Sequence, residues 1–313
     1  MNYLLKDRQK IYKKFSNIDI TSFDKKSVLG HGVQGKVYRY CTKNNFCVAV
    51  KKMYVDKNTS RYINKTNSKQ ALENSILSEL FIKKNLINKI LLEGVSPNFV
   101  FLYNYHFEER DGICYEDYPY ASYFYNEYQY KTEELNDWIY KKRSIKMLYN
   151  AFFQIISAIY TIQKQFNLLH LDLHSANILV KNITPGGYFK YIINNIEYNV
   201  PNLGYLFIII DFGFGYIPKN KNKDREYDVK FILNDIKSDI PEKILNDLKY
   251  ITKNLKSNKI NFEDLINEIW GDMYKKVPNS SKLLEVYYVD KKIKLENKIK
   301  EIIKKGFNDN NNY

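Results

Sequence analysis

Short apolar runs alternate with polar turns over roughly the first 130 residues of the chain. The runs that predict β-strands cover residues 36–39, 47–53, 99–105 and a tyrosine-rich segment at about 121–125. Between residues 71 and 92 the apolar positions recur instead at helical spacing, as at Ile76, Leu77 and Leu80. The polar residues 55–70 predict a surface loop. This half of the chain therefore predicts a small β-rich unit that carries one helix.

Helical patterns dominate after about residue 130. The predicted helices begin near residue 135 and then cover 147–166, 227–237, 241–255, 261–275 and 281–305. Short strands are predicted at 178–180 and 205–210, and Asn194-Asn195 between β-like flanks predicts a two-residue hairpin turn.

The pattern divides the chain into four parts. They are an N-terminal extension (1–21), a β-rich lobe (22–130), a mainly helical lobe (131–305) and a disordered polar tail (306–313).

Composition fits an ordinary soluble protein, with 313 residues and 44% hydrophobic side chains. The longest unbroken apolar stretch, residues 206–210 after Tyr205, is far shorter than the roughly 18 residues of a membrane span. Three cysteines are too few for a disulfide framework and fit a reducing compartment. We therefore expect a cytoplasmic protein with no transmembrane segment.

The charge balance is strongly basic. Lys+Arg number 49 and Asp+Glu number 35, which gives a formal net charge of +14. This surplus favours an anionic partner, such as a nucleotide, an acidic protein or a membrane surface. The many Lys, Asn, Ile and Tyr residues also indicate AT-rich coding DNA, which weakens a functional interpretation of the charge.

Glycines form the first motif with chemical meaning. They belong to a G-x-G-x-x-G-x-V pattern that runs Leu29, Gly30, His31, Gly32, Val33, Gln34, Gly35, Lys36, Val37. Such glycines let backbone approach phosphate oxygens without a Cβ clash. A strand rather than a helix follows, which disfavours a dinucleotide-binding fold.

Lys51 follows in Val-Ala-Val-Lys on a predicted strand, where it can contact a nucleotide phosphate as a point charge.

Two later segments carry acidic and amide side chains, one between the long helix and a strand and one at the end of a buried strand. Asp172 lies in His-Leu-Asp-Leu-His, and an aspartate can accept the proton of an attacking hydroxyl. Asn177 and Asp211 offer the hard oxygen ligands that Mg²⁺ prefers.

The four segments, in this order, resemble the signature set of protein kinases. The resemblance implies a bilobal α+β fold with a small N-lobe and a larger helical C-lobe. It implies that the loop at 29–37 covers ATP phosphates and that Lys51 binds the α/β-phosphates. It further implies that Asp172 is the catalytic base, that Asn177 and Asp211 ligate Mg²⁺, with Mn²⁺ as an alternative ion, and that Phe212 packs under the helix.

The same resemblance implies a hinge for adenine, with backbone near Glu127 and Gln129 facing the base. It also implies a helix glutamate that pairs with Lys51. Periodicity favours Glu73, whereas the distance to Pro97 favours Glu79, and we lean to Glu79.

Departures from the kinase pattern narrow the expectation. Leu171 replaces the usual arginine before the catalytic aspartate, and only 14 residues separate Gly213 from Asp228. We therefore expect a short activation segment and activity without its phosphorylation. His174 stands where protein kinases usually carry lysine, which resembles atypical and small-molecule kinases. The insertion 183–204 resembles that of kinases from large DNA viruses.

These residues predict an ATP- and Mg²⁺-dependent serine/threonine kinase acting on proteins of unknown identity. A kinase of small hydroxyl compounds and an ATP-binding pseudokinase remain alternatives. If the source is viral, the host cytoplasm or the virion is the expected location. No dedicated nucleic-acid motif occurs, and peripheral membrane contact stays open.

Overall fold

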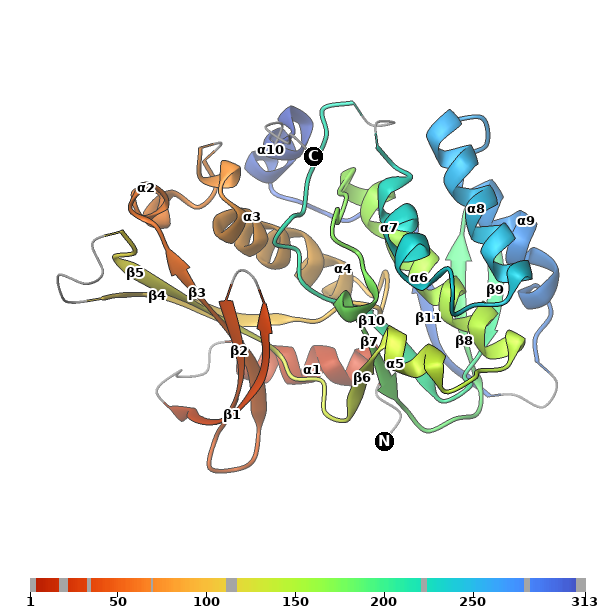
Figure 1. The fold of residues 1–313 in the computed structure, drawn as a ribbon, viewed down its shortest axis with the longest axis horizontal. Coiled ribbons are helices and arrows are strands. Elements are labelled where there is room, and N and C mark those ends of the chain that lie inside the picture. The colour runs from red at the N-terminus through yellow and green to blue at the C-terminus, as the bar shows by residue number, and fades with distance from the viewer. Residues whose placement is uncertain are drawn as a thin grey trace.

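The computed structural model describes residues 4–16, 22–32, 35–68, 70–110, 117–220, 224–278 and 282–307. They form two lobes, one built on a twisted antiparallel sheet and one mainly helical (Figure 1). The predicted bilobal α+β architecture is confirmed.

Five antiparallel strands build the N-lobe. They are β1 (Asp24–Gly32), β2 (Gly35–Cys41), β3 (Cys47–Val55), β4 (Leu102–Glu109) and β5 (Tyr120–Glu127), in the order β1-β2-β3-β5-β4. Val48 and Val50 of β3 are buried in one apolar cluster, and Met53 and Val55, which face the other side of the sheet, are buried in a second cluster. The central position of β3 fixes Lys51 in the middle of the lobe.

The N-lobe helix begins later than its apolar periodicity suggests. A short 3₁₀ turn, η3 (Ala71–Glu73), precedes α3 (Ser75–Ile82), which continues through a π-helical segment, η4 (Lys83–Ile87), into α4 (Asn88–Leu92). The side chain of Asn74 accepts hydrogen bonds from the N–H groups of Ile76 and Leu77 and so caps the helix.

The loop prediction for 55–70 is partly wrong. It contains the end of β3, the short helix α2 (Lys57–Ser60) and the 3₁₀ turn η2 (Ile63–Lys65). The side chain of Asp56 accepts hydrogen bonds from the N–H groups of Asn58 and Thr59 and so caps the N-terminus of α2.

Helix α1 (Leu5–Phe15), in the predicted N-terminal extension, packs against the N-lobe (Figure 1). Tyr12 stacks on Phe101 with ring centroids 4.5 Å apart, and Phe15 stacks on Phe46 at 3.6 Å. The N–H groups of Leu5 and Lys6 donate to the carboxylate of Glu285 in the C-lobe. Helix α1 therefore contacts both lobes.

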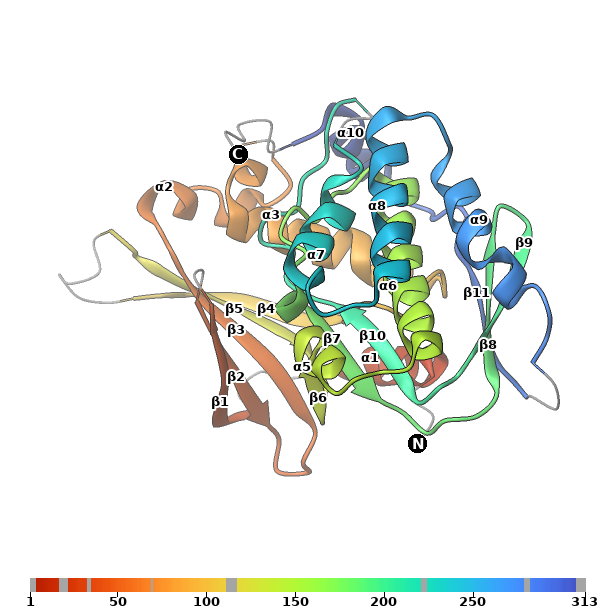
Figure 2. The same cartoon turned by 45° about the vertical axis from the view of Figure 1, so that its right-hand side comes forward.

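The C-lobe surrounds the long helix α6. Its elements are β6 (Thr132–Glu134), α5 (Leu135–Tyr140), α6 (Ile145–Phe166), η6 (Ser175–Asn177), β7 (Ile178–Asn182), β10 (Tyr205–Ile209), α7 (Tyr227–Ile236), α8 (Glu242–Ser257), α9 (Phe262–Tyr274) and α10 (Asn297–Lys305). Strands β10, β7 and β6 form a small sheet in that order. Figure 2 shows α7 and α8 beside α6.

Of the described helices, α6 alone has the length and apolar composition that crossing a membrane would require. In this fold 83% of its most apolar window is buried in protein, which is the behaviour of a core helix.

The insertion at 183–204 forms a hairpin of β8 (Tyr188–Ile193) and β9 (Ile196–Pro201). Asn194 and Asn195 both have positive φ, 49° and 62°, so the predicted two-residue turn is confirmed. Strand β11 (Leu283–Tyr288) pairs in parallel with β8. The predicted helix at 281–305 is therefore wrong in its first part, because β8 offers a pairing edge to a segment rich in Val and Tyr.

A disulfide joins Cys41 and Cys47, which face each other across the β2–β3 hairpin with Cα atoms 4.1 Å apart. The expectation of cysteines without a bridge is wrong for this pair, because strand register brings together thiols six residues apart. Cys114 lies outside the described residues.

The predicted disordered tail starts with two packed residues. Phe307 is buried, and its N–H donates to the carbonyl of Ile217. Its ring lies edge-on to Phe81 of α3 with centroids 5.7 Å apart. The disorder prediction is therefore wrong for residues 306 and 307, because the Phe307 ring packs against Phe81 of α3 while its backbone bonds to Ile217. Residues 308–313 lie outside the described part of the chain.

We expect Phe307→Ala to lower the free energy of unfolding by about 3 kcal/mol, because it leaves a cavity between Phe81 and Ile217. Urea denaturation measures the loss. Phe231→Ala is the matched control, since Phe231 is exposed and its removal should cost no more than about 0.5 kcal/mol. Equal losses for the two variants would show that Phe307 contributes no packing.

Candidate active site

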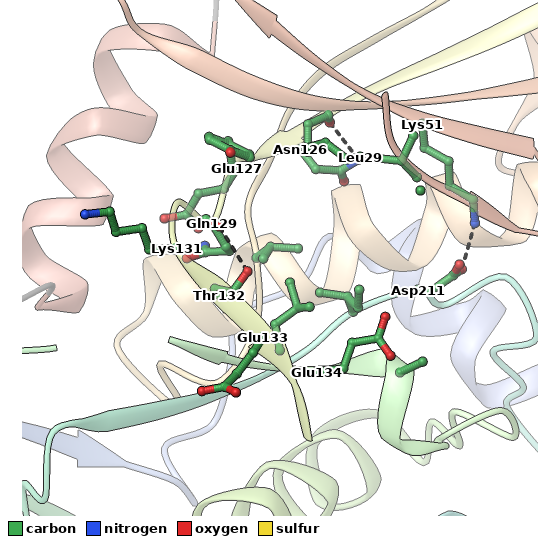
Figure 3. A pocket seen from close by; sticks show the side chains of 18 of the residues that line it. Leu29, Lys51, Asn126, Glu127, Gln129, Lys131, Thr132, Glu133, Glu134 and Asp211 are labelled. Atoms are coloured by element: carbon green, nitrogen blue, oxygen red, sulfur yellow. Dashed lines mark hydrogen bonds and ion pairs between the residues drawn. The ribbon is translucent and has the colours of Figure 1, made fainter. Parts of the chain in front are cut away.

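A cavity of about 510 Å³ lies between the two lobes (Figure 3). Leu29, Val37 and Ala49 line it from the N-lobe sheet, and Leu179 and Ile210 line it from the C-lobe. The lining is thus apolar on two opposite sides, which suits a flat ring. Lys51 and Asp211 lie together at one end, and Glu127, Lys131 and Glu133 lie toward the other end.

The ammonium group of Lys51 is buried and shared by two carboxylates. Its Nζ lies 2.9 Å from Oε2 of Glu79 and 2.7 Å from Oδ1 of Asp211. A second buried lysine, Lys83, pairs with Oε1 of Glu79 at 2.5 Å. Two positive and two negative groups therefore balance in one cluster.

This pairing keeps the cluster charged. Burial alone would lower the pKa of Lys51, but the attraction of Glu79 and Asp211 outweighs it and raises the pKa to about 12. Burial alone would raise the pKa of Asp211, but Lys51 and Lys83 lower it to about 2. Both groups are ionised throughout the physiological range.

The geometry distinguishes the two candidate glutamates. Glu79 is fully buried and contacts Lys51, whereas Glu73 is exposed and precedes the helix cap. Periodicity favoured Glu73 because the apolar pattern continues through a 3₁₀ turn that the helix does not include.

The loop between α6 and β7 brings three predicted residues together. The Nδ2 of Asn177 donates to the carbonyl of Asp172 at 2.8 Å and lies 3.3 Å from its Oδ2. The same Nδ2 lies 3.1 Å from Nε2 of His174, which accepts in this arrangement because an amide nitrogen only donates. His174 Nε2 and Asp172 Oδ2 are 3.7 Å apart.

The side chain of Asp228 in α7 holds this loop through hydrogen bonds to its backbone. It is fully buried and accepts hydrogen bonds from the N–H groups of His170 and Leu171 at 2.9–3.2 Å. Burial raises the pKa of Asp228, and nearby His170 and these N–H bonds oppose the shift. Leu171 has a left-handed φ of 59°, a strained value that the two N–H bonds help to maintain. Asp235 of α7 adds a further bond to the N–H of Ser175 at 2.7 Å, a contact that the sequence did not indicate.

His170 links the loop to the segment between β10 and Asp211. Its Nε2–H donates to the carbonyl of Ile210 at 2.8 Å, and its Nδ1 accepts from the N–H of Asp172 at 3.3 Å. The N–H of Ile210 also donates to the carbonyl of Asn177 at 3.0 Å. These bonds hold Asn177 and Asp211 on neighbouring backbone. Phe212 is buried against His170, with ring centroids 4.8 Å apart.

The oxygen donors here fit a magnesium ion. The amide nitrogen of Asn177 faces Asp172, which leaves its oxygen for a cation, and Asp211 supplies a carboxylate. Within the described residues no group of three or more His, Cys, Asp or Glu side chains is placed to hold a metal. Magnesium sites that share their ion with substrate phosphates need only one or two protein carboxylates, so this set suffices.

Residues of the glycine-rich segment line two different hollows, the interlobe cavity and a separate one. Leu29, Gly30 and Val37 line the cavity, and a Cβ on Gly30 would meet nothing within 4 Å, so the backbone there is open to a ligand. Gly35 has φ 155°, and a Cβ there would lie 2.2 Å from the carbonyl oxygen of Lys52, so only glycine fits. The remaining members fall elsewhere. His31 and Lys36 line a separate hollow on the outer side, Gly32 ends β1, and Val33 and Gln34 lie outside the described residues.

Both predicted hinge residues, Glu127 and Gln129, lie along the cavity, but Glu127 has an unpredicted side-chain partner. Arg8 of α1, which is 1% exposed, donates to the two carboxylate oxygens of Glu127 at 2.8 and 2.7 Å. It also donates to the carbonyls of Pro97, at 2.6 Å, and Phe99. The hinge residue Glu127 is thus held by Arg8, which lies 119 positions away in the sequence. An arginine in an otherwise lysine-rich basic helix is the one sequence signal for it.

A two-lobed fold whose interlobe cavity holds a buried Lys–Glu pair, an Asp–Asn loop and a further aspartate at a strand end defines the protein-kinase class. The Haspin like kinase domain model matches residues 2–284, and the chain belongs to that family.

Viral proteins are among its relatives. Protein 011L of Invertebrate iridescent virus 3 is 38% identical over 66 residues, which is 21% of this chain and 9% of that protein. "Probable serine/threonine-protein kinase 380R" of Invertebrate iridescent virus 6 is 38% identical over 69 residues, 21% of this chain and 13% of that protein. Protein 019R of Frog virus 3 (isolate Goorha) is 36% identical over 66 residues, 20% of this chain and 8% of that protein. The chain thus spans a small part of the relatives it matches.

We expect Arg8→Met to lower the free energy of unfolding by about 3–5 kcal/mol, because it removes the guanidinium group that donates to both oxygens of the buried Glu127 carboxylate. Adding Glu127→Leu should recover a large part of that loss. The remainder, about 1–3 kcal/mol, reflects the carbonyls of Pro97 and Phe99 and the N–H of Phe101, which donates to Glu127. Urea denaturation of both single variants and the double variant measures the coupling, and additive losses would contradict a buried ion pair.

Proposed function

We propose that this chain is an ATP- and Mg²⁺-dependent kinase that transfers the γ-phosphoryl group of ATP to serine or threonine hydroxyls of proteins. The observation that carries the proposal is the sharing of Lys51 between Glu79 and Asp211, beside a loop that holds Asp172 and Asn177 together. A pseudokinase is disfavoured because each of these side chains is present.

The residues divide the work of phosphoryl transfer. Lys51, held by Glu79, supplies positive charge to the phosphates at the end of the cavity that Asp211 also lines. Asp172 orients the acceptor hydroxyl and takes its proton, with its position set by Asn177 and by the bonds from Asp228 to the loop. Asn177 and Asp211 would hold the metal ion, which neutralises charge that develops on the transferring group. Positioning and electrostatics, rather than covalent chemistry, supply the rate.

The segment after Gly213 supports activity without phosphorylation. Tyr216 and Leu169 exchange backbone hydrogen bonds at 2.8 and 2.9 Å, and Ile217 pairs with Phe307. Backbone pairing thus orders the segment after Gly213. In many kinases a phosphate on this segment binds an arginine that precedes the catalytic aspartate, and Leu171 replaces that arginine here.

A small hydroxyl compound is the second candidate acceptor, favoured by His174 beside Asp172. The proposed preference for protein hydroxyls over small hydroxyl compounds is therefore tested by comparing the two kinds of acceptor directly.

Protein made in a cell-free system without other kinases should transfer label from γ-labelled ATP to protein substrates. Asp172→Asn should slow transfer by about 100-fold or more, since the general base is lost. Transfer to small alcohols but not to proteins would favour the second candidate. A protein that binds ATP but transfers nothing, with or without phosphorylation by another kinase, would be a pseudokinase. Activity that appears only after such phosphorylation would contradict a self-ordered segment.

The two glutamates of the helix region provide a matched pair of variants. Glu79→Gln should lower kcat by about tenfold or more, because Lys51 loses a charged hydrogen-bond partner. Glu73→Gln should leave kcat nearly unchanged, since Glu73 is exposed. If steady-state kinetics gave the same change in kcat for both variants, the Lys51–Glu79 contact would not contribute to the reaction.

A further inference from the structure

A second hollow, of about 490 Å³, lies in the N-lobe and has no part in the proposed reaction. It is bordered by the start of β2, the end of β3, the first residues of α3 and the segments next to β4 and β5. No described residue lines both this hollow and the interlobe cavity. We call it the outer hollow, and its chemistry is separate from that of the Lys51 cluster.

Positive charge dominates the lining of the outer hollow. Lys36, Lys52 and Arg110 line it, against one carboxylate among the described residues, that of Asp56. This carboxylate already accepts hydrogen bonds from two N–H groups at the start of α2. Three cations and one anion leave a surplus of two positive charges. A phosphorylated side chain carries a charge of about −2 at neutral pH, so it matches this surplus.

The two lysines lie directly opposite each other, because Lys36 of β2 pairs in register with Lys52 of β3. Like charges placed in this way on neighbouring strands are destabilising. The Nζ of Lys52 lies 4.9 Å from the ring centroid of Tyr123, a contact that leaves its charge in place. Neither lysine has an ion-pair partner within the described part of the chain, and neither is buried. A bound anion would therefore relieve their repulsion.

Arg110 is held in place at the rim of the outer hollow. Its guanidinium group lies 4.3 Å from the ring centroid of Tyr54 and donates to the carbonyl of Tyr118 at 3.2 Å. Both partners line the hollow as well. An arginine already ordered in this way loses little freedom when a phosphate binds, and its N–H groups match phosphate oxygens well.

An extended peptide is the carrier of phosphate that the strand edges favour. The pairing of β2 with β3 ends at Lys36 and Lys52, whereas β3 continues to Val55, and no described residue pairs with 53–55 on that side. Such an edge can add an extended segment through backbone hydrogen bonds. Nucleic acids and membranes present rows of phosphates and need an extended basic surface, whereas these cations converge on one hollow.

We propose that the outer hollow binds a phosphorylated side chain on an extended segment of a partner protein. The phosphate lies among Lys36, Lys52 and Arg110, and the flanking backbone follows the free edge of β3. The inference goes beyond the proposed function and does not depend on it, because it concerns binding outside the interlobe cavity. Ser75 begins the helix that carries Glu79 and also lines the hollow, so the occupant would touch the helix of the Lys51 cluster.

The test uses short fluorescein-labelled peptides of alanine and valine with a central phosphoserine or phosphotyrosine, and their unphosphorylated counterparts. Fluorescence anisotropy measures each dissociation constant. We expect at least one phosphorylated peptide to bind about tenfold or more tightly than its counterpart, since charge-assisted hydrogen bonds to phosphate are lost without it. The double variant Lys36→Gln/Lys52→Gln should remove most of that difference.

Lys253→Gln/Lys256→Gln is the matched control, because it removes two charges from exposed lysines of α8 in the other lobe. It should leave the preference for the phosphorylated peptide unchanged. If the double variant at 36 and 52 does not fold, as judged by thermal melting, Lys36→Gln alone removes one charge from an exposed position and should weaken binding severalfold.

Four results would overturn the inference. They are equal binding of phosphorylated and unphosphorylated peptides, an unchanged preference in the variants at 36 and 52, an equal loss in the α8 control, and competition by inorganic phosphate as strong as by the phosphopeptide. Tighter binding of single-stranded DNA or of phosphatidylserine vesicles through Lys36 and Lys52 would likewise assign the hollow to another partner. No ATP is present in these measurements, so they and the transfer assay of the proposed function can fail separately.

Discussion

The buried ammonium group of Lys51 is the contact on which the rest of the site depends. It joins Lys51 of the central strand β3 to Glu79 of helix α3 and to Asp211, which follows β10. Removing such a charge from water costs several kcal/mol, so the contact is favourable only while both carboxylates stay in place. Lys83 adds a second positive charge and balances the pair of carboxylates. Electrostatic balance therefore fixes the position of the helix against the sheet and links the N-lobe to the C-lobe.

Helix α3 is held in that position by packing at its far side. Phe307 packs against Phe81, two residues from Glu79, and bonds through its backbone to Ile217. Ile217 follows Tyr216, which pairs with Leu169 just before the catalytic loop. One connected set of contacts thus runs from the helix through the C-terminal segment to Asp172. In the proposed function these contacts would order the short segment after Gly213 without the arginine that Leu171 replaces.

Local sequence patterns predicted the parts of the site that local chemistry defines. Gly35 and Asp211 have positive φ values that few residue types adopt, and Asp172 lies in the turn between α6 and η6, so their spacing marked them as candidate site residues. Glu79 stayed ambiguous because the apolar periodicity runs past the cap at Asn74 and does not mark where the helix begins. Arg8, Phe307 and strand β11 were missed for another reason. Each depends on a partner more than 90 residues away, as in Arg8–Glu127 and Tyr287–Tyr191, and apolar or basic character alone does not encode a distant partner.

Charge balance also explains how a closed cluster can accept a highly charged ligand. Lys51 and Asp211 neutralise each other at 2.7 Å, so neither charge is exposed without compensation. For the proposed substrate, Lys51 would exchange the Asp211 carboxylate for phosphate oxygens, and Asp211 would exchange the ammonium for a divalent cation. Each group keeps an opposite charge throughout, while Glu79 holds Lys51 from the other side. The exchange leaves the number of compensated charges unchanged, so binding avoids the cost of stranding a buried charge. A phosphate ligand without a cation would satisfy Lys51 alone and leave Asp211 facing negative charge, which is a physical reason for the two to bind together.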